Sequence, residues 1–164
     1  MAFWNQKRML PVGARAPEFQ LPDLGGTDRS LTGILANGPA LLAFFKASCP
    51  VCQYTFPFLE RLHQGAKSGG IQIVAISQDK AGATHEFCRE YGVTFLTLLD
   101  DPATYPASNG FAIANVPSLF LIEADGTVSA GASGFSKRLL ETVGQRAGVV
   151  PFRQGESVPE LRPG

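Results

Sequence analysis

A short apolar segment, followed closely by two cysteines, is the feature that most constrains how this chain folds. Residues Ala40–Phe45 read ALLAFF, and Cys49 and Cys52 come shortly after them, separated by Pro50 and Val51. An apolar run of this length is typical of a strand that is buried on both faces of a sheet. Proline is favoured at the first position of a helix, because its missing N–H would have no partner there. The segment therefore predicts a buried strand, a turn, and a helix that begins beside the cysteines.

The predicted helix start gives the two sulfur atoms different environments. Cys49 would be the N-cap residue, with its sulfur facing the free amides of Val51 and Cys52. Those amides and the helix dipole favour a thiolate over a thiol, so we expect Cys49 to be the reactive group. Cys52 would lie one turn further along the same face and be more buried. We interpret Cys49 as the attacking thiol and Cys52 as the resolving thiol of a redox-active disulfide.

Metal binding and simple packing are the alternative roles for this pair. A structural zinc site needs about four ligands, but the remaining candidates, Cys88, His63 and His85, show no spacing that would add them to Cys49 and Cys52. A Cys-x-x-Cys sequence among alternating strands and helices is typical of redox chemistry. We therefore expect no metal and no cofactor, because electrons pass through the sulfurs. We expect Cys88 to pack on the apolar face of its helix, and both histidines to be solvated.

The rest of the chain alternates between strand and helix patterns, which predicts an α/β fold with a mixed sheet. The predicted elements are a hairpin (Phe19–Leu21 with Arg29–Leu31), a brief helix (Leu31–Ala36), strands (Ala40–Phe45, Ile71–Ile76, Thr94–Leu99), helices (Cys49 to about Lys67, Lys80–Tyr91, Tyr105–Ile113), a second hairpin (Ser118–Ile122 with Thr127–Gly131) and a last helix (Ser136–Arg146).

Composition supports one globular domain in the 164 residues, with a core of about 12–147 and an irregular segment at 148–164. Hydrophobic residues make up 45% and charged residues 17%, which argues against disorder. Basic and acidic residues number 14 each without a basic run, so we expect no nucleic acid partner. The longest apolar run is far shorter than the roughly 20 residues of a membrane span.

The N-terminal residues predict a cytoplasmic location. No apolar stretch follows Lys7 and Arg8, and Pro11 and Gly13 interrupt the next segment, so these residues do not read as a signal peptide. A location outside the cytoplasm would fit only if residues that precede this sequence had been removed.

Five features resemble the thioredoxin-like superfamily, in the branch that holds the alkyl hydroperoxide reductase/thiol-specific antioxidant (AhpC/TSA) proteins and the TlpA-type thiol–disulfide oxidoreductases. Gly13–Leu21 resembles the opening segment of that branch. Ile73–Asp79 and Leu98–Asp101 are similar to its central insertion. Asn115–Ile122 resembles the strand that carries a cis-proline, and Pro57 matches a proline within the helix that follows the cysteines.

The resemblance implies a thioredoxin-like fold: a mixed central sheet flanked by helices, with an N-terminal β-hairpin extension. It implies a thiol–disulfide oxidoreductase that exchanges disulfides with protein dithiol or disulfide substrates through Cys49 and Cys52. A partner reductase or oxidant would then reset the pair. It also implies a cis bond between Val116 and Pro117 beside the cysteines, where the Val116 backbone would bind an extended substrate segment.

The chain departs from the family at three positions around the cysteines, and two of these usually carry the carboxylates that handle the proton of the buried thiol. Ser48 stands where a tryptophan commonly precedes the first cysteine. Ala43 and Thr55 stand where thioredoxin and many TlpA-type reductases, respectively, carry an acidic residue. Without those carboxylates, we expect Cys52 to lose its proton by another route, through solvent or Lys46. Lys46 is also a candidate modulator of the thiolate.

Two other functions remain open for this fold. Peroxiredoxins resemble one another in a threonine three residues before the peroxide-attacking cysteine, but Lys46 holds that position relative to Cys49, and Cys49 holds it relative to Cys52. A peroxiredoxin-like thiol peroxidase is therefore the less favoured enzyme. A non-enzymatic binding module that keeps the thioredoxin fold is the third alternative.

Overall fold

The ALLAFF segment forms β3 (Ala40–Phe45), the central strand of a five-stranded sheet with the order β5-β4-β3-β6-β7. The structure, a computed structural model, describes residues 9–66 and 70–164. The N-terminal residues 1–8, which entered the prediction of location, and Lys67, the predicted end of a helix, lie outside the described residues. Every residue of β3 is buried, as the apolar run predicts, because sheet neighbours flank it on both edges.

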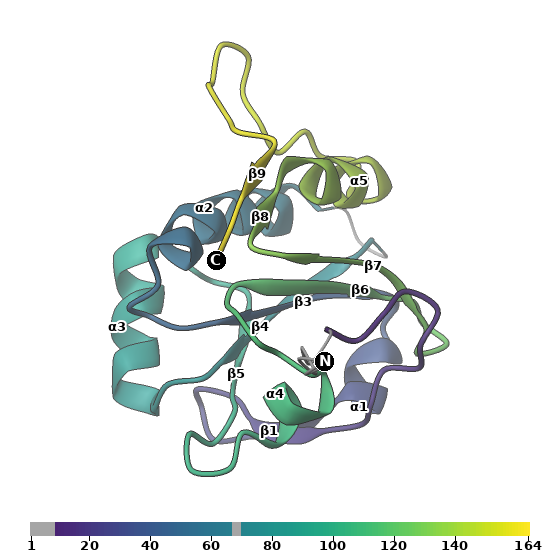
Figure 1. Ribbon diagram of the computed structural model, residues 1–164, viewed down its shortest axis with the longest axis vertical. Helices are drawn as coiled ribbons and strands as arrows, with labels where there is room; N and C mark the ends of the chain where they lie inside the picture. Colours follow the sequence, from purple (N-terminus) through teal and green to yellow (C-terminus); the bar gives the residue numbers. More distant parts are fainter. Residues whose placement is uncertain (1–8, 67–69) are drawn as a thin grey trace, which may run out of the picture.

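The sheet is mixed, as predicted. β4 (Gln72–Ser77) runs parallel to β3, and β5 (Leu96–Leu99) runs parallel to β4. On the other edge, β6 (Ser118–Ile122) is antiparallel to β3 and forms a hairpin with β7 (Val128–Ser133). The carboxyl end of β3 therefore lies beside the carboxyl end of β4 and the start of β6 (Figure 1).

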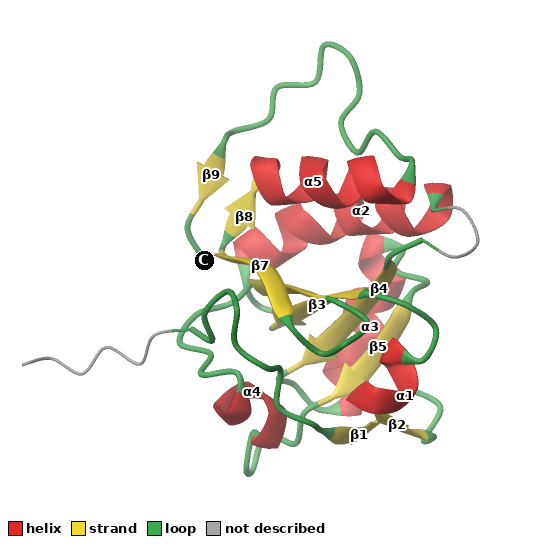
Figure 2. Ribbon diagram, turned by 90° about the vertical axis from the view of Figure 1, so that its right-hand side faces the viewer, coloured by secondary structure: helices red, strands yellow, loops and turns green. Residues whose placement is uncertain are grey.

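Alternate side chains of β3 enter two different cores, because successive residues of a strand point to opposite faces. Leu41, Ala43 and Phe45 join a cluster with residues of α2 (Pro50–Gly65), α3 (Ala81–Tyr91) and α5 (Lys137–Ala147). Leu42 and Phe44 join a second cluster with residues of α1 (Leu31–Leu35) and α4 (Pro106–Gly110). Figure 2 shows α2 and α5 on one side of the sheet and α1 and α4 on the other.

The predicted N-terminal hairpin is also confirmed. β1 (Gln20–Pro22) pairs antiparallel with β2 (Asp28–Ser30), and Ser30 caps α1 by accepting a hydrogen bond from Gly33 N–H. The fold is thus a thioredoxin-like α/β fold whose sheet carries helices on both faces and a hairpin at its N-terminal side.

The segment after α5 was predicted to be irregular, but in the structure it is attached to the rest of the domain by a short strand pairing and an ion pair. It is irregular over most of its length, but Leu161–Arg162 form β9, which pairs antiparallel with β8 (Phe135–Ser136). Arg61 of α2 forms a two-pronged ion pair with Glu156, at 2.8 and 3.0 Å. Strands of two residues carry no periodicity, which is why the sequence did not predict them.

Candidate active site

The two cysteines lie where β3 gives way to α2. Cys49 is the N-cap residue of α2, with extended backbone, and Pro50 occupies the first helical turn, as predicted. The Cys52 N–H donates a hydrogen bond to Cys49 Sγ at 3.2 Å. Cys49 is half-buried and Cys52 is completely buried, and both are free thiols. The geometry thus offers one accessible sulfur, held by a helix amide, and one enclosed sulfur on the next turn.

Burial strongly distinguishes Cys52 from an ordinary thiol. Loss of solvent raises the pKa of the Cys52 thiol well above its usual value, and its hydrogen bond with Cys49 raises it further. A buried thiolate is unfavourable because few solvent dipoles remain to stabilise its charge. Cys52 therefore keeps its proton in the reduced protein, which suits a thiol that reacts second.

Asp79 is a neighbour of the pair that our sequence reasoning missed as a site residue. Its Oδ2 accepts a hydrogen bond from Ala47 N–H at 2.7 Å, in the turn before Cys49. Its negative charge adds to the effect of burial in raising the pKa of Cys52. Asp79 closely follows β4, and the parallel strands β3 and β4 end at the same edge of the sheet. Its position just after a predicted strand could therefore have indicated that it lies near the cysteines.

Two positions hold an apolar or neutral side chain where related proteins carry a carboxylate. Ala43 is buried within β3. Thr55 is also buried, and its hydroxyl donates to the Val51 carbonyl oxygen one turn earlier, at 2.7 Å. Among the described residues, Asp79 is thus the carboxylate whose charge acts on Cys52.

Val116 reaches the cysteines from the loop that precedes β6, the antiparallel neighbour of β3. The Val116–Pro117 bond is cis, as the resemblance implied. Cys49 Sγ lies 3.5 Å from the Val116 carbonyl oxygen. The Val116 N–H donates no hydrogen bond to any residue that the structure describes. An unpaired backbone group beside a reactive sulfur is a place where another chain can pair.

A groove of about 490 Å³ opens in front of Cys49. Its walls come from the end of β3, from α4 and from the segment before Pro117. Lys46 contributes the charged side chain among the described lining residues. The polar lining residues besides Lys46 are Gln78, Tyr105, Ser108, Asn109 and Asn115.

The α4 wall of the groove is fixed by a buried carboxylate. Asp100 is completely buried and accepts hydrogen bonds from the Ala107 and Ser108 N–H groups at 2.9 and 2.8 Å, and from the Ser108 hydroxyl at 2.6 Å. Tyr105, just before α4, has a positive φ of 45°, which a non-glycine residue seldom adopts. The carboxylate holds the first turn of α4 in place despite this strained entry.

The other candidate residues lie apart from the pair. Cys88 is half-buried rather than buried as predicted, and its sulfur lies 3.8 Å from the Thr97 hydroxyl; partial burial still raises its pKa. His63 and His85 are exposed, as predicted. The described residues contain no cluster of three or more histidine, cysteine or acidic side chains that could hold a metal ion. Within the same residues, every helix is too short or too polar to cross a membrane.

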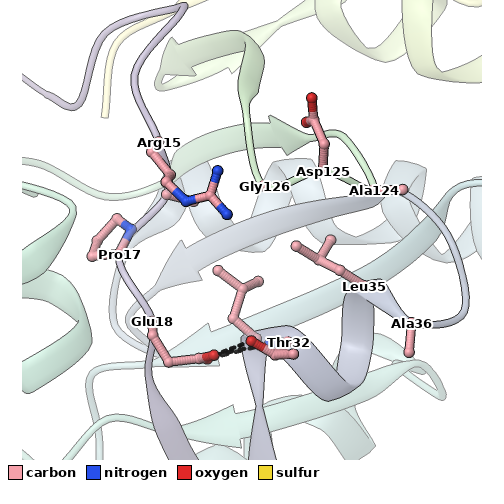
Figure 3. A pocket seen from close by; sticks show the side chains of 11 residues that line it. Arg15, Pro17, Glu18, Thr32, Leu35, Ala36, Ala124, Asp125 and Gly126 are labelled. Atoms are coloured by element: carbon pink, nitrogen blue, oxygen red, sulfur yellow. Dashed lines mark hydrogen bonds between the residues drawn. The ribbon is translucent and has the colours of Figure 1, made fainter.

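A second hollow, of about 700 Å³, lies between the N-terminal segment, α1 and the β6–β7 turn. Figure 3 shows the Arg15 guanidinium beside Gly126 and the Glu18 carboxylate bonded to Thr32. Its lining holds no cysteine or histidine. We therefore assign the chemistry to the groove in front of Cys49.

Known proteins similar to this chain share both the fold and the activity that the cysteine pair suggests. ResA, a thiol-disulfide oxidoreductase of Bacillus subtilis (strain 168), is 30% identical over 128 residues, which cover 77% of this chain and 70% of ResA. A putative thiol:disulfide interchange protein DsbE from Chlorobium tepidum superimposes with a TM-score of 0.73 at 27% identity, covering 84% of this chain and 95% of that one. The thioredoxin domain of a thiol-disulfide oxidoreductase from Bacteroides vulgatus shares the fold, with a TM-score of 0.75 at 22% identity, over 84% of this chain and 99% of that one.

The fold, the paired cysteines and these similarities define a thiol–disulfide oxidoreductase of the ResA/TlpA type. The AhpC/TSA family matches residues 12–130 of the sequence. This chain belongs to the AhpC/TSA family.

Proposed function

We propose that the protein exchanges disulfides with protein substrates through the Cys49-Pro50-Val51-Cys52 pair, and that Val116 binds the substrate backbone. One observation carries the proposal: Cys49 Sγ accepts the Cys52 amide hydrogen bond while lying 3.5 Å from the Val116 carbonyl, at the edge of an open groove. A sulfur in that position can meet a disulfide that an extended segment presents along Val116.

In the reducing direction, the Cys49 thiolate attacks one sulfur of the substrate disulfide. A bond forms between Cys49 and that sulfur, and the second substrate sulfur leaves as a thiolate that takes up a proton. Cys52 then gives up its proton and attacks Cys49 Sγ. The Cys49–Cys52 disulfide forms, and the first substrate sulfur leaves as a thiol. The substrate gains two electrons and the pair loses two.

A partner must return the pair to its starting state after each cycle. In the reducing direction the partner is a reductant that delivers two electrons to the Cys49–Cys52 disulfide. In the reverse direction the substrate is a dithiol and the partner an oxidant. The Asp79 carboxylate is the group we propose as acceptor of the Cys52 proton when Cys52 attacks. It accepts the Ala47 N–H in the turn before Cys49, and its charge acts on the Cys52 thiol.

Reduction of insulin disulfides by the pre-reduced protein tests this proposal. We expect Cys49→Ser to abolish the reaction, and Cys52→Ser to stop at a mixed disulfide that mass spectrometry locates on Cys49. Cys88→Ser is the matched control and should keep wild-type activity. Full activity of the Cys49→Ser variant would exclude the mechanism and favour a binding module.

A redox titration of the pair then gives the direction of electron flow. A potential near about −270 mV would indicate a reductase suited to a reducing compartment such as the cytoplasm, whereas a value near about −150 mV would indicate an oxidase or isomerase. If no Cys49–Cys52 bond forms at any potential, the pair is not redox-active.

A further inference from the structure

The final described residue, Gly164, lines the same groove as Cys49, and the C-terminus lies near the start of α2 (Figure 1). Leu161–Gly164, which we term the strap, pair with β8 through Leu161 and Arg162. Gly164 then enters the groove that Cys49 and Val116 line. The strap therefore covers part of the surface that the proposed function assigns to the substrate.

The contact between the strap and the groove is made backbone to backbone, and glycine permits it. A β-carbon on Gly164 would overlap the Val116 carbonyl oxygen and lie 2.7 Å from the carbonyl carbon. Gly134, which has a φ of 83°, also lies against the strap backbone. A β-carbon on Gly134 would overlap the Arg162 carbonyl oxygen and lie 2.9 Å from the Gly164 nitrogen. Two residues without side chains thus allow the strap to lie against Val116.

The segment that leads to the strap is anchored to α2 and to the start of α5, and Arg162 of the strap contacts α2. The Lys137 N–H donates to the Glu160 carbonyl oxygen at 3.0 Å, and Arg61 holds Glu156. The Arg162 guanidinium lies over the Tyr54 ring of α2, 4.9 Å from its centre. These contacts hold the chain in a position from which the strap reaches the groove.

The strap itself is held more weakly than the segment before it. β9 is only two residues long, and the Leu161 side chain is 71% exposed. Little apolar surface is buried, so displacing the strap costs little hydrophobic free energy. The anchored segment can stay in place while Leu161–Gly164 move aside.

We propose that the strap occupies the surface where the substrate docks, and that the substrate displaces it. The substrate is an extended polypeptide segment that carries the target disulfide. The incoming segment takes the place of β9 along β8 and reaches Val116, as a strand adds to an open sheet edge. This inference rests on the proposed function, because it names the surface that the same substrate uses. It also concerns a part of the chain beyond the family match, which ends at residue 130.

A strap that competes with substrate has a defined kinetic signature. When only a fraction of molecules is open, the apparent affinity for substrate is reduced by that fraction. Weakening the strap should therefore lower KM for a protein disulfide without changing the chemistry at Cys49. A small disulfide needs no docking along β8, so its reaction rate should be insensitive to the strap.

Gly164→Ala is the variant that tests this, because a methyl group there meets the Val116 carbonyl. Gly82→Ala is its matched control, since a β-carbon on Gly82, in α3, meets no atom within 4 Å. We expect Gly164→Ala to lower KM for insulin by about three- to tenfold, with kcat and the rate with 5,5′-dithiobis(2-nitrobenzoate) unchanged within about twofold. Gly82→Ala should match wild type in all three.

Arg162→Ala gives a second route to the same result, because it removes the cation from the Tyr54 ring without altering the groove. Hydrogen exchange adds a readout independent of activity: the amides of residues 161–164 should exchange faster in both strap variants. They should also exchange faster in Cys52→Ser once a cysteine peptide is trapped on Cys49.

The possible results distinguish an error in the strap proposal from an error in the proposed function. An unchanged KM in both strap variants, with normal wild-type activity, would overturn the strap alone. A raised KM would also overturn it, because the segment would then hold the substrate instead of excluding it. A wild-type protein that reacts with the small disulfide but not with insulin would exclude protein substrates, and the strap proposal with them.

Discussion

Cys49 Sγ and the carbonyl oxygen of Val116 lie 3.5 Å apart, although 67 positions separate the two residues in the sequence. The sheet brings them together: Phe44, near the end of β3, is paired with Ser118, at the start of β6. The loop before β6 and the turn after β3 therefore meet at one edge. This contact joins the reactive sulfur to the backbone that we propose binds the substrate.

The different surroundings of the three cysteines predict selective alkylation. We expect iodoacetamide to modify Cys49 at least about tenfold faster than Cys52 or Cys88 in the reduced protein at pH 7, because thiolate character and access control the rate. Cys49 lines the groove, whereas burial raises the pKa of the other two thiols. Peptide mass spectrometry after brief labelling measures the order, and early labelling of Cys52 would contradict it.

The raised pKa of Cys52 predicts a loss of stability at alkaline pH. An unfolded thiol ionises near pH 8.5 or so, but folded Cys52 keeps its proton, so the unfolded state binds fewer protons above that pH. The stabilisation that the buried Cys52 thiol gives to the folded state is complete below about pH 8.5. Above that pH it decreases by up to about 1.4 kcal/mol per pH unit.

Urea unfolding under reducing conditions at several pH values measures this effect, with Cys52→Ala as the reference. The reference retains Cys88, so the contribution of that thiol cancels in the comparison. We expect the stability of wild type relative to the reference to decrease between pH 8 and 10. Parallel pH profiles would show that Cys52 ionises as easily in the folded protein as in the unfolded chain.

Removal of the Asp79 charge should make Cys52 easier to ionise. Asparagine at this position can still accept the Ala47 hydrogen bond, so Asp79→Asn removes the charge with little change in shape. In a Cys49→Ser background, we expect Asp79→Asn to increase the alkylation rate of Cys52 at pH 8 by about threefold, because loss of the negative charge lowers the pKa of the thiol. Asp101→Asn is the control for a general change of charge. Equal rates in the two variants would exclude an effect of Asp79 on Cys52.

The buried carboxylate of Asp100 should contribute strongly to stability. Asp100→Ala leaves the Ala107 and Ser108 amides without their partner. We expect it to lower the free energy of unfolding by about 2–4 kcal/mol. The adjacent Asp101→Ala, whose carboxylate is exposed and accepts from Ala103 N–H, should cost less than about 1 kcal/mol.

Asp100→Ala should also raise KM for insulin, because α4 forms one wall of the groove. Denaturant unfolding and insulin reduction, measured on both aspartate variants, check the two expectations. If both variants lost the same stability, Asp100 would have no special role in holding α4.

Local sequence determined the elements that carry the cysteines. The run Ala40–Phe45 is apolar throughout, so the strand and its burial could be predicted without knowledge of its neighbours. Pro50 predicted where α2 begins, and with it the capping position of Cys49. Residues 124–126 read Ala-Asp-Gly, a turn sequence between the two predicted strands, and this local signal is the basis of the predicted β6–β7 hairpin. Such features depend on residues that are close in sequence, and their preferences are local.

Only the tertiary structure decided which distant groups surround the sulfur atoms. The placement of Asp79 beside the pair depends on the parallel alignment of β3 and β4, and Coulomb effects on Cys52 depend on that distance and on burial. The approach of Gly164 to Val116 depends on a two-residue strand pairing that has no sequence period. Contacts of this kind arise from the packing of elements, because the chain between them does not specify their separation.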